Sequence, residues 1–248
     1  IVFHGSWRLI FLIVAILTGL SFWGLKKYMP EPLGQTNSEG KLIQAQPFKC
    51  SVIFNNYLTL LKSKDFVFTL VMYGLMGIPC MNWIGLSPIM IINPEKSSLF
   101  IYALWQIPMF SSFLFANTLL QKWVEKIGLQ RLMHIGVITV IIALAASYFS
   151  LHLFGADYKG LIPIFVLYFF GYAIASSPIY RLLFSMTEVS RGTSGALISL
   201  GVMLIQSLGI EIGNHLFHAQ GYFYLSYFFI ALSLLIGILY QITNKQSA

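Results

Sequence analysis

Glu211 and His215 are the residues whose types and spacing most clearly suggest chemistry. They lie in the stretch "SLGIEIGNHLFH" (207–218), which ends a run that is almost wholly apolar and small from Gly192 onward. A carboxylate and an imidazole four residues apart share one face of a helix and can pair. Ionisable residues inside a bilayer are typical of proton relays and of counter-charges for substrates. A role in proton handling is therefore a hypothesis that depends on the depth of Glu211 in the membrane.

The composition indicates an integral membrane protein. The 248 residues are 57% hydrophobic and only 9% charged, with a mean hydropathy of +0.78, whereas about a quarter of the residues in soluble domains are charged. A net charge of +7 can indicate nucleic-acid binding, but the basic residues are scattered between apolar runs, so we expect no nucleic-acid partner. Cys50 and Cys80 have neither a disulfide framework nor metal-ligand spacing, and we expect no metal or other cofactor.

Seven apolar runs are long enough to cross a bilayer as helices, which takes about 20 residues. They lie at 9–25, 66–92, 99–120, 132–153, 161–180, 193–214 and 222–242. The sequence therefore predicts an all-α, polytopic membrane protein. Between the first two runs, the chain is polar at first and then amphipathic, with apolar residues at helical spacing: Ile53, Phe54, Tyr57, Leu60 and Leu61. This pattern predicts either a helix on the membrane surface or a plain linker helix.

The distribution of Lys and Arg predicts the orientation. Seven crossings place the loops alternately on two sides. Twelve of the fifteen basic residues fall on one side, against Arg8, Lys96 and Lys159 on the other. By the positive-inside rule, the side with twelve faces the cytoplasm. We therefore expect a multi-pass protein of the inner (cytoplasmic) membrane, surrounded by the lipid bilayer, with the connection 26–65 and the C-terminus in the cytoplasm.

This layout puts Glu211 close to the outer interface and not at the midplane. Its span starts near Arg191 on the cytoplasmic side, and at 1.5 Å per residue Glu211 lies about 30 Å further on. It is also on the opposite face from a stripe of small and polar residues with spacings of three and four, namely Gly195, Ser199, Val202, Gln206, Gly209 and Gly213. Two interpretations remain, an interfacial pair with His215 and a role in proton handling.

No predicted span has an acid or a base near its middle. His134 lies within a turn of a cytoplasmic end, and Arg181 closes a span. A proton-coupled transporter needs a titratable group that water and substrate can reach, so we expect the coupling groups to lie outside this sequence. An intramembrane hydrolase or transferase needs a buried nucleophile and base. Neither is visible, and we do not expect an enzyme.

The middles of the spans instead carry prolines and uncharged polar residues. Pro79 and Pro88 bracket "CMNWIGLS" in the second span, and Gln106 lies two residues before Pro108 in the third. Polar side chains in lipid are tolerated chiefly where they face protein or a water-filled cavity. One face of the second span is predicted to be either a packing face or the wall of a cavity, and its members are Gly74, Gly77, Met81, Ile84 and Pro88.

An ordered set of stretches resembles the major facilitator superfamily, in particular MdfA-type multidrug/proton antiporters. The stretches are "WIGLSPIMII" (83–92), "LWQIPMF" (104–110), "SRGTSGA" (190–196) and "GIEIGNH" (209–215), and "EKIGLQR" (125–131) is similar to a degraded copy of the superfamily's acidic-basic-x-Gly-x-x-basic loop. The resemblance runs from the end of the fifth helix of such a transporter through its twelfth. It implies that residues 1–25 are the last helix of the N-terminal domain, 26–65 the cytoplasmic central loop with an interfacial helix, and 66–248 the C-terminal six-helix domain. The membrane-embedded acidic residues of such antiporters are then expected in helices that precede Ile1.

The resemblance also implies where a substrate is contacted. The second, third, fifth and sixth spans are expected to face a central cavity. The drug-contacting positions of the second span fall on Cys80, Met81 and Ile84, and those of the sixth on Ser199 and Val202. Gln106 and Gln206 complete the expected substrate cavity as its uncharged polar members, and Glu211 and His215 are the expected proton-linked candidates.

These expectations define a first functional hypothesis and its alternatives. The first is a fragment of a proton-coupled transporter that exports lipophilic, often cationic compounds by alternating access, with small molecules and protons as partners. A carrier of sugars or organic anions is the alternative within the superfamily, although it is expected to place more Asn, Gln, Arg or Lys in the cavity helices than Asn82, Gln106 and Gln206 supply. A structural or nonfunctional membrane fragment that lacks its coupling half is the alternative from another class.

Overall fold

The computed structural model describes residues 7–29, 50–92, 99–187 and 189–246, and every regular element in these ranges is an α-helix. The helices are α1 (Trp7–Tyr28), α2 (Cys50–Lys62), α3 (Lys64–Ile91), α4 (Leu99–Ile127), α5 (Leu129–Ala145), α6 (Ser147–Phe154), α7 (Tyr158–Ser185), α8 (Arg191–Gln220) and α9 (Tyr222–Gln246). Six of them are long and apolar enough to cross a membrane, and the number rises to seven if the bent pair α5 and α6 is counted as one span. The predicted all-α polytopic fold is therefore confirmed over the described residues, and the seven-span topology stays a prediction.

Contact density divides the chain into two units, Ile1–Lys49 and Cys50–Ala248. The first unit contains α1, whose side chains are almost all exposed. Lys26 and Lys27 occupy its last turn, and the Lys27 ammonium lies 4.9 Å from the centre of the Trp23 ring. Basic and aromatic side chains at one end of an apolar helix are typical of a membrane interface.

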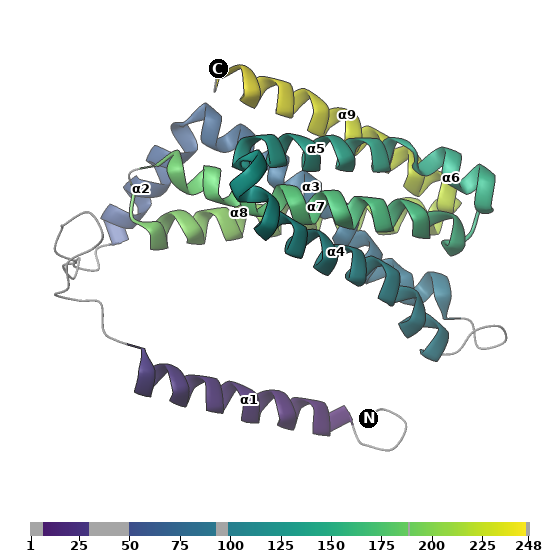
Figure 1. Ribbon diagram of the computed structural model, residues 1–248, viewed down its shortest axis with the longest axis horizontal. Helices are drawn as coiled ribbons and strands as arrows, with labels where there is room; N and C mark the ends of the chain where they lie inside the picture. Colours follow the sequence, from purple (N-terminus) through teal and green to yellow (C-terminus); the bar gives the residue numbers. More distant parts are fainter. Residues whose placement is uncertain (1–6, 30–49, 93–98, 188, 247–248) are drawn as a thin grey trace. The chain divides into compact units, whose positions relative to one another are not determined.

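The second unit is a helical bundle in which α5, α7 and α9 lie side by side and α4 crosses obliquely over α7 (Figure 1). The predicted fourth span, 132–153, is not a single helix. It bends by 49° between α5 and α6, at Ala146. The Ser147 hydroxyl donates to the Leu144 carbonyl at 2.7 Å and lies 3.4 Å from the Ser226 carbonyl of α9. Such back-bonding by serine competes with the helical ladder and often bends helices.

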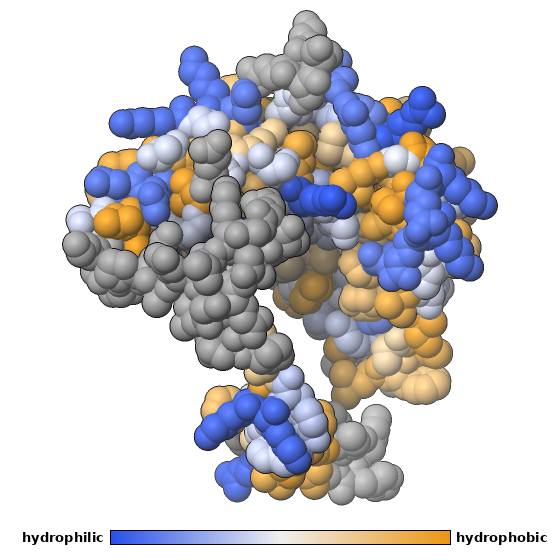
Figure 2. Space-filling view, turned by 60° about the vertical axis from the view of Figure 1, so that its left-hand side comes forward, coloured by the Kyte–Doolittle hydropathy of each residue, from blue (hydrophilic) through white to orange (hydrophobic). Residues whose placement is uncertain are grey.

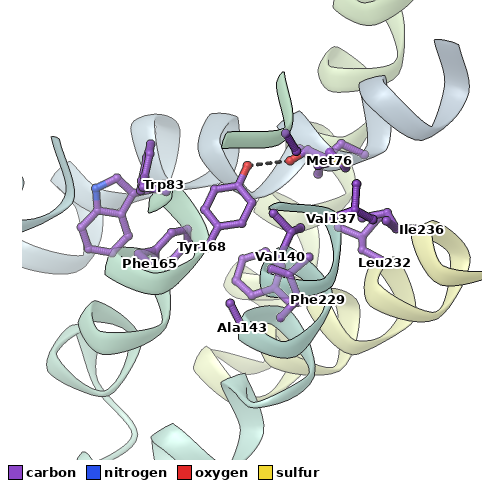
Figure 3. Packing of buried hydrophobic residues seen from close by; sticks show 14 of the residues in the cluster. Met76, Trp83, Val137, Val140, Ala143, Phe165, Tyr168, Phe229, Leu232 and Ile236 are labelled. Atoms are coloured by element: carbon purple, nitrogen blue, oxygen red, sulfur yellow. Dashed lines mark hydrogen bonds between the residues drawn. The ribbon is translucent and has the colours of Figure 1, made fainter. Parts of the chain in front are cut away.

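Most residues in the core of the bundle come from α3, α5, α7 and α9. Figure 3 shows Trp83 of α3 beside Phe165 and Tyr168 of α7, with Val137 and Val140 of α5 packed toward α9. Trp83, Phe165 and Tyr168 are each at most 1% exposed. Aromatic rings in such offset contacts add stabilisation beyond the area they bury.

Small residues let two pairs of helices approach closely. On α5 and α7, Gly136 and Gly171 face each other: a Cβ on Gly136 would lie 2.6 Å from the Ala175 amide nitrogen. On α3 and α8, Gly209 packs against Ile78, and Gly213 packs against the Asn82 side chain. Close backbone approach at glycine is a characteristic means of helix association in membranes.

The predicted amphipathic helix is confirmed as α2. Of the five apolar residues that defined it, Leu60 is buried, Ile53 and Tyr57 are half-buried, and Phe54 and Leu61 are exposed. The helix contacts both α3 and α8, where those two helices begin (Figure 1). Its apolar stripe is therefore partly used for packing, and two large apolar side chains remain at the surface.

Gly128 is the single residue between α4 and α5, within the "EKIGLQR" stretch. Its φ of +85° lies in the region that other residues adopt only at a cost. Glycine at this position allows the chain to leave α4 and enter α5 through one residue. The Asp157 carboxylate then fixes the start of α7, because it accepts from the Lys159 and Gly160 amides at 2.8 and 3.3 Å.

Candidate substrate-contacting site

In the middle of α3, beside Pro79, a tyrosine from α7 hydrogen-bonds to the backbone. A proline has no amide hydrogen, so it cannot donate to the carbonyl four residues earlier. Next to this gap, the Tyr168 hydroxyl donates to the Met76 carbonyl at 2.6 Å and accepts from the Cys80 amide at 3.3 Å. In a regular helix these two backbone groups would bond to each other. Figure 3 shows the Tyr168 ring reaching from α7 to the Met76 backbone.

Further polar groups gather at this level of α3. Tyr172, one turn beyond Tyr168, stacks on it with ring centres 5.7 Å apart and 12° between the ring planes. The side-chain amide of Gln206, on α8, lies directly against Gly77, so that a Cβ added to Gly77 would clash with this amide. The same added Cβ would lie 3.3 Å from the Tyr172 hydroxyl, so the Tyr172 side chain also reaches this part of α3. Uncharged polar groups from α7 and α8 therefore meet at this level of α3.

The predicted contact residues of α3 lie at the edge of this group. Cys80 and Met81 are half-buried, and Ile84 is 49% exposed. The face that could be a packing face or a cavity wall is divided: Gly74 and Gly77 pack against α8, whereas the face opens from Met81 to Ile84. A thiol, a thioether and a branched aliphatic chain form a lipophilic surface that offers dispersion contacts and no charge.

Gln106 of α4 is hydrogen-bonded to Trp83 of α3. Its Oε1 accepts from the Trp83 indole nitrogen at 2.8 Å, and its Nε2 is buried without a partner among the described residues. The amide therefore has one donor group available near this part of α3. Asn82, by contrast, donates from Nδ2 to the Ile78 and Gly209 carbonyls, both at 3.2 Å, so its donors serve the contact between α3 and α8.

The predicted positions on α8 have different environments. Gln206 is 9% exposed and lies in the contact with α3, Val202 is half-buried, and Ser199 is exposed. Gly209 and Gly213 of the same predicted stripe are buried. The stripe is therefore a packing face toward the C-terminal end of α8 and an open one at Ser199.

Glu211 and His215 are both exposed on α8, and neither has an ion-pair partner within the part of the chain that the structure describes. They lie on the side of α8 where Leu204 and Leu208 are 57% and 67% exposed. The structure thus does not bring them together with Cys80 or Gln106. Across the same described ranges, no three His, Cys, Asp or Glu side chains are grouped so that they could hold a metal ion.

Tyr168 and Tyr172 were not among the predicted site residues. Both lie in "YFFGY" (168–172), with Gly171 between them. Two phenols one turn apart on a glycine-containing apolar span are a signal that was present in the sequence. The role of Tyr168 depends on its contact with the backbone of α3 at Cys80, and these two residues are 88 positions apart in the sequence.

The fold and this site define a polytopic, all-helical membrane protein with an uncharged, largely lipophilic candidate site on α3. Multidrug transporter MdfA of Edwardsiella piscicida is 30% identical over 213 residues, and Multidrug transporter MdfA of Escherichia coli O157:H7 has the same identity over the same length. Each match covers 84% of this chain and 49% of the relative. Multidrug transporter MdfA of Yersinia pestis (strain D106004) is 27% identical over 214 residues, which cover 85% of this chain and 49% of that protein.

These matches confirm the resemblance to MdfA-like transporters of the major facilitator superfamily that was expected from the sequence. The chain spans about half the length of the curated relatives it matches. No protein-family model matches it.

Proposed function

We propose that this chain forms the C-terminal part of a proton-coupled multidrug efflux transporter in the inner membrane, which exports lipophilic, often cationic compounds by alternating access. The observation that supports this most is the similarity to multidrug transporters over 213 residues. Cys80, Met81 and Ile84 are the proposed substrate contacts on α3. Their side chains offer apolar surface without fixed hydrogen-bond geometry, which suits ligands that differ in shape.

Ser199 and Val202 of α8, with Gln106 of α4, are proposed as further members of the same cavity. Gln206 is proposed as a polar boundary of the cavity, because its side chain lies between Gly77 and Tyr172. The remaining polar groups favour lipophilic substrates over sugars or organic anions. The Asn82 donors are bonded to backbone carbonyls and the Gln106 carbonyl is bonded to Trp83. The Asn82 Oδ1 and the Gln106 Nε2 stay unpartnered within the described part of the chain, so these two amides offer one acceptor and one donor group and no charge for recognising a polar solute.

Proton coupling is proposed to reside in helices outside this sequence. In the described spans, the titratable side chains nearest the bundle middle are tyrosines and Cys80, whereas Glu211 and His215 lie exposed in the C-terminal third of α8. The twelve-to-three distribution of basic residues supports an orientation with the C-terminus in the cytoplasm.

A chimera tests the proposal. The aligned part of Multidrug transporter MdfA of Escherichia coli O157:H7 is replaced with this chain, and the efflux of a lipophilic cationic dye is measured in energised membrane vesicles. We expect dye efflux from the chimera and a loss of at least tenfold when Ile84→Asp is introduced, because an unpaired carboxylate in an apolar wall costs several kcal/mol.

The matched control is Ile84→Leu, which keeps the volume and the apolar character of the side chain. It should retain efflux at the same membrane abundance. A chimera that is inserted at normal levels but does not move the dye would contradict the proposal. Equal efflux in the Asp and Leu variants would show that this face does not contact the substrate.

A further inference from the structure

A cavity of about 330 Å³ lies between the ends of α3, α5, α7 and α9, away from the site on α3 around Cys80. It is formed where α3 and α5 begin and where α7 and α9 end, at the end of the bundle that lies on the left in Figure 1. The predicted topology places these four ends on the cytoplasmic side. In Figure 2 this end is turned forward, and hydrophilic side chains gather along it above the hydrophobic flank.

The wall of the cavity is amphiphilic. Its exposed members are all polar, namely Gln130, Arg181, Ser185 and Asn244. Its half-buried members are apolar or aromatic, and they include Met133 and Leu182. A ligand that matches this wall has a polar group at the mouth of the cavity and an apolar body inside.

Arg181 gives the cavity its charge. Among the described residues that line the cavity, it is the one charged residue, and none of them is acidic. The Arg181 guanidinium has no ion pair or hydrogen bond with any residue in the described ranges. Two helix N-termini and two C-termini meet at this cavity, so their partial charges largely offset one another. The guanidinium therefore sets a positive potential at the mouth.

We propose that this cavity is a binding site for a phosphate group carried on an apolar body, with Arg181 contacting the phosphate and the side chains around Met133 and Leu182 contacting the body. A guanidinium matches phosphate geometry with two parallel hydrogen bonds. Basic pockets between membrane helices on the cytoplasmic side are suited to the head groups of acidic phospholipids. The apolar wall favours such a lipid over a soluble phosphate, which would leave that wall in contact with water. This site is independent of the efflux proposal.

Lipid binding to the 248-residue chain tests the proposal without any transport measurement. The chain is purified in detergent, and binding of fluorescent phosphatidylglycerol is compared with binding of phosphatidylcholine that carries the same label. We expect preference for phosphatidylglycerol. Arg181→Gln should weaken phosphatidylglycerol binding about tenfold, the size expected for one charge-assisted contact.

The matched control is Arg191→Gln. Arg191 begins α8 at the same end of the bundle and is exposed, but it does not line the cavity. This variant should bind phosphatidylglycerol as the unmodified chain does. Equal weakening by both substitutions would overturn the proposal, because it would indicate attraction to basic surface in general, and so would the absence of any effect of Arg181→Gln.

A second variant tests the apolar part and keeps the charge. Met133→Trp fills the cavity, and it should reduce phosphatidylglycerol binding while the thermal unfolding temperature shows that the chain is folded. Unchanged lipid binding in this folded variant would overturn the proposed location. Addition of millimolar inorganic phosphate distinguishes the sources: retention of the lipid supports a lipid site, whereas its displacement supports a site for soluble phosphate with the same Arg181 contact.

Discussion

The Tyr168 hydroxyl donates a 2.6 Å hydrogen bond to the Met76 carbonyl and accepts a 3.3 Å bond from the Cys80 amide. One side chain of α7 thus links two backbone groups of α3 beside Pro79. This connection fixes the register of the two helices at the level of the proposed substrate contacts. It also orients the backbone of Cys80, whose side chain lies at the edge of the open face.

Tyr168→Phe removes this link and keeps the ring. We expect the free energy of unfolding of the chain to fall by about 0.5–2 kcal/mol, as measured by denaturant titration in detergent micelles, because the Met76 carbonyl and the Cys80 amide lose their shared partner. Tyr180→Phe is the control, since Tyr180 lies on the same helix but is 38% exposed. Similar losses in both variants would argue against a specific role for the Tyr168 hydroxyl.

Gly136→Ala is expected to destabilise the contact between α5 and α7. The new Cβ would lie 2.6 Å from the Ala175 nitrogen and 2.8 Å from the Gly171 carbonyl oxygen. Backbone atoms cannot rotate away, so the helices must separate, at a cost of about 1–3 kcal/mol. Gly192→Ala, where a Cβ meets nothing within 4 Å, should leave the unfolding temperature unchanged or slightly raised. A neutral Gly136→Ala variant would contradict the close approach of the two helices.

The orientation can be tested with single cysteines in a variant that lacks Cys50 and Cys80. Lys126→Cys, at the end of α4, should react only when a thiol reagent can enter the cytoplasm. Lys159→Cys, in the first turn of α7, should react with an impermeant reagent from outside. Both lysines are exposed, so burial does not prevent labelling. Reaction of both positions from the same side of the membrane would exclude the proposed seven-span topology.

Glu211→Gln in the chimera with the Escherichia coli relative should leave pH-driven dye efflux intact. Glu211 is exposed in the C-terminal third of α8 and has no ion-pair partner among the described residues, so no charge pair is lost with its carboxylate. The substitution keeps the shape and removes the charge, so it tests titration more than packing. His215→Gln serves as the companion control. Loss of pH-dependent efflux in Glu211→Gln at normal abundance would assign proton coupling to this carboxylate.

The spans were predictable because each depends on local composition alone. About 20 apolar residues in succession satisfy the bilayer wherever their helix packs, and the observed helices extend the predicted runs by a few residues at most ends. The bend at Ala146 was not predictable, because its neighbouring residue Ser147 forms hydrogen bonds that depend on helical geometry and on α9.

Helix faces were predictable only in part. Gln206, Gly209 and Gly213 lie together and are buried, as a single stripe on α8 predicts, yet Ser199 of the same stripe is exposed. Periodicity shows which residues share a face, but it does not show how far a neighbouring helix follows that face. The substrate-contact positions came from resemblance and remain a prediction, whereas the Tyr168 link required the three-dimensional register of α3 and α7.

The bonds of Asn82 have a consequence for the order of membrane insertion. Its Nδ2 donates to Ile78 on its own helix and to Gly209, which is synthesised 127 residues later. When α3 first leaves the ribosome and the translocon, the second carbonyl does not yet exist. The amide then has only its own helix, water or the insertion machinery to bond with, and lipid supplies no substitute. Release of α3 into bulk lipid is therefore least costly after α8 has been made, which couples the biogenesis of two helices that are distant in the sequence.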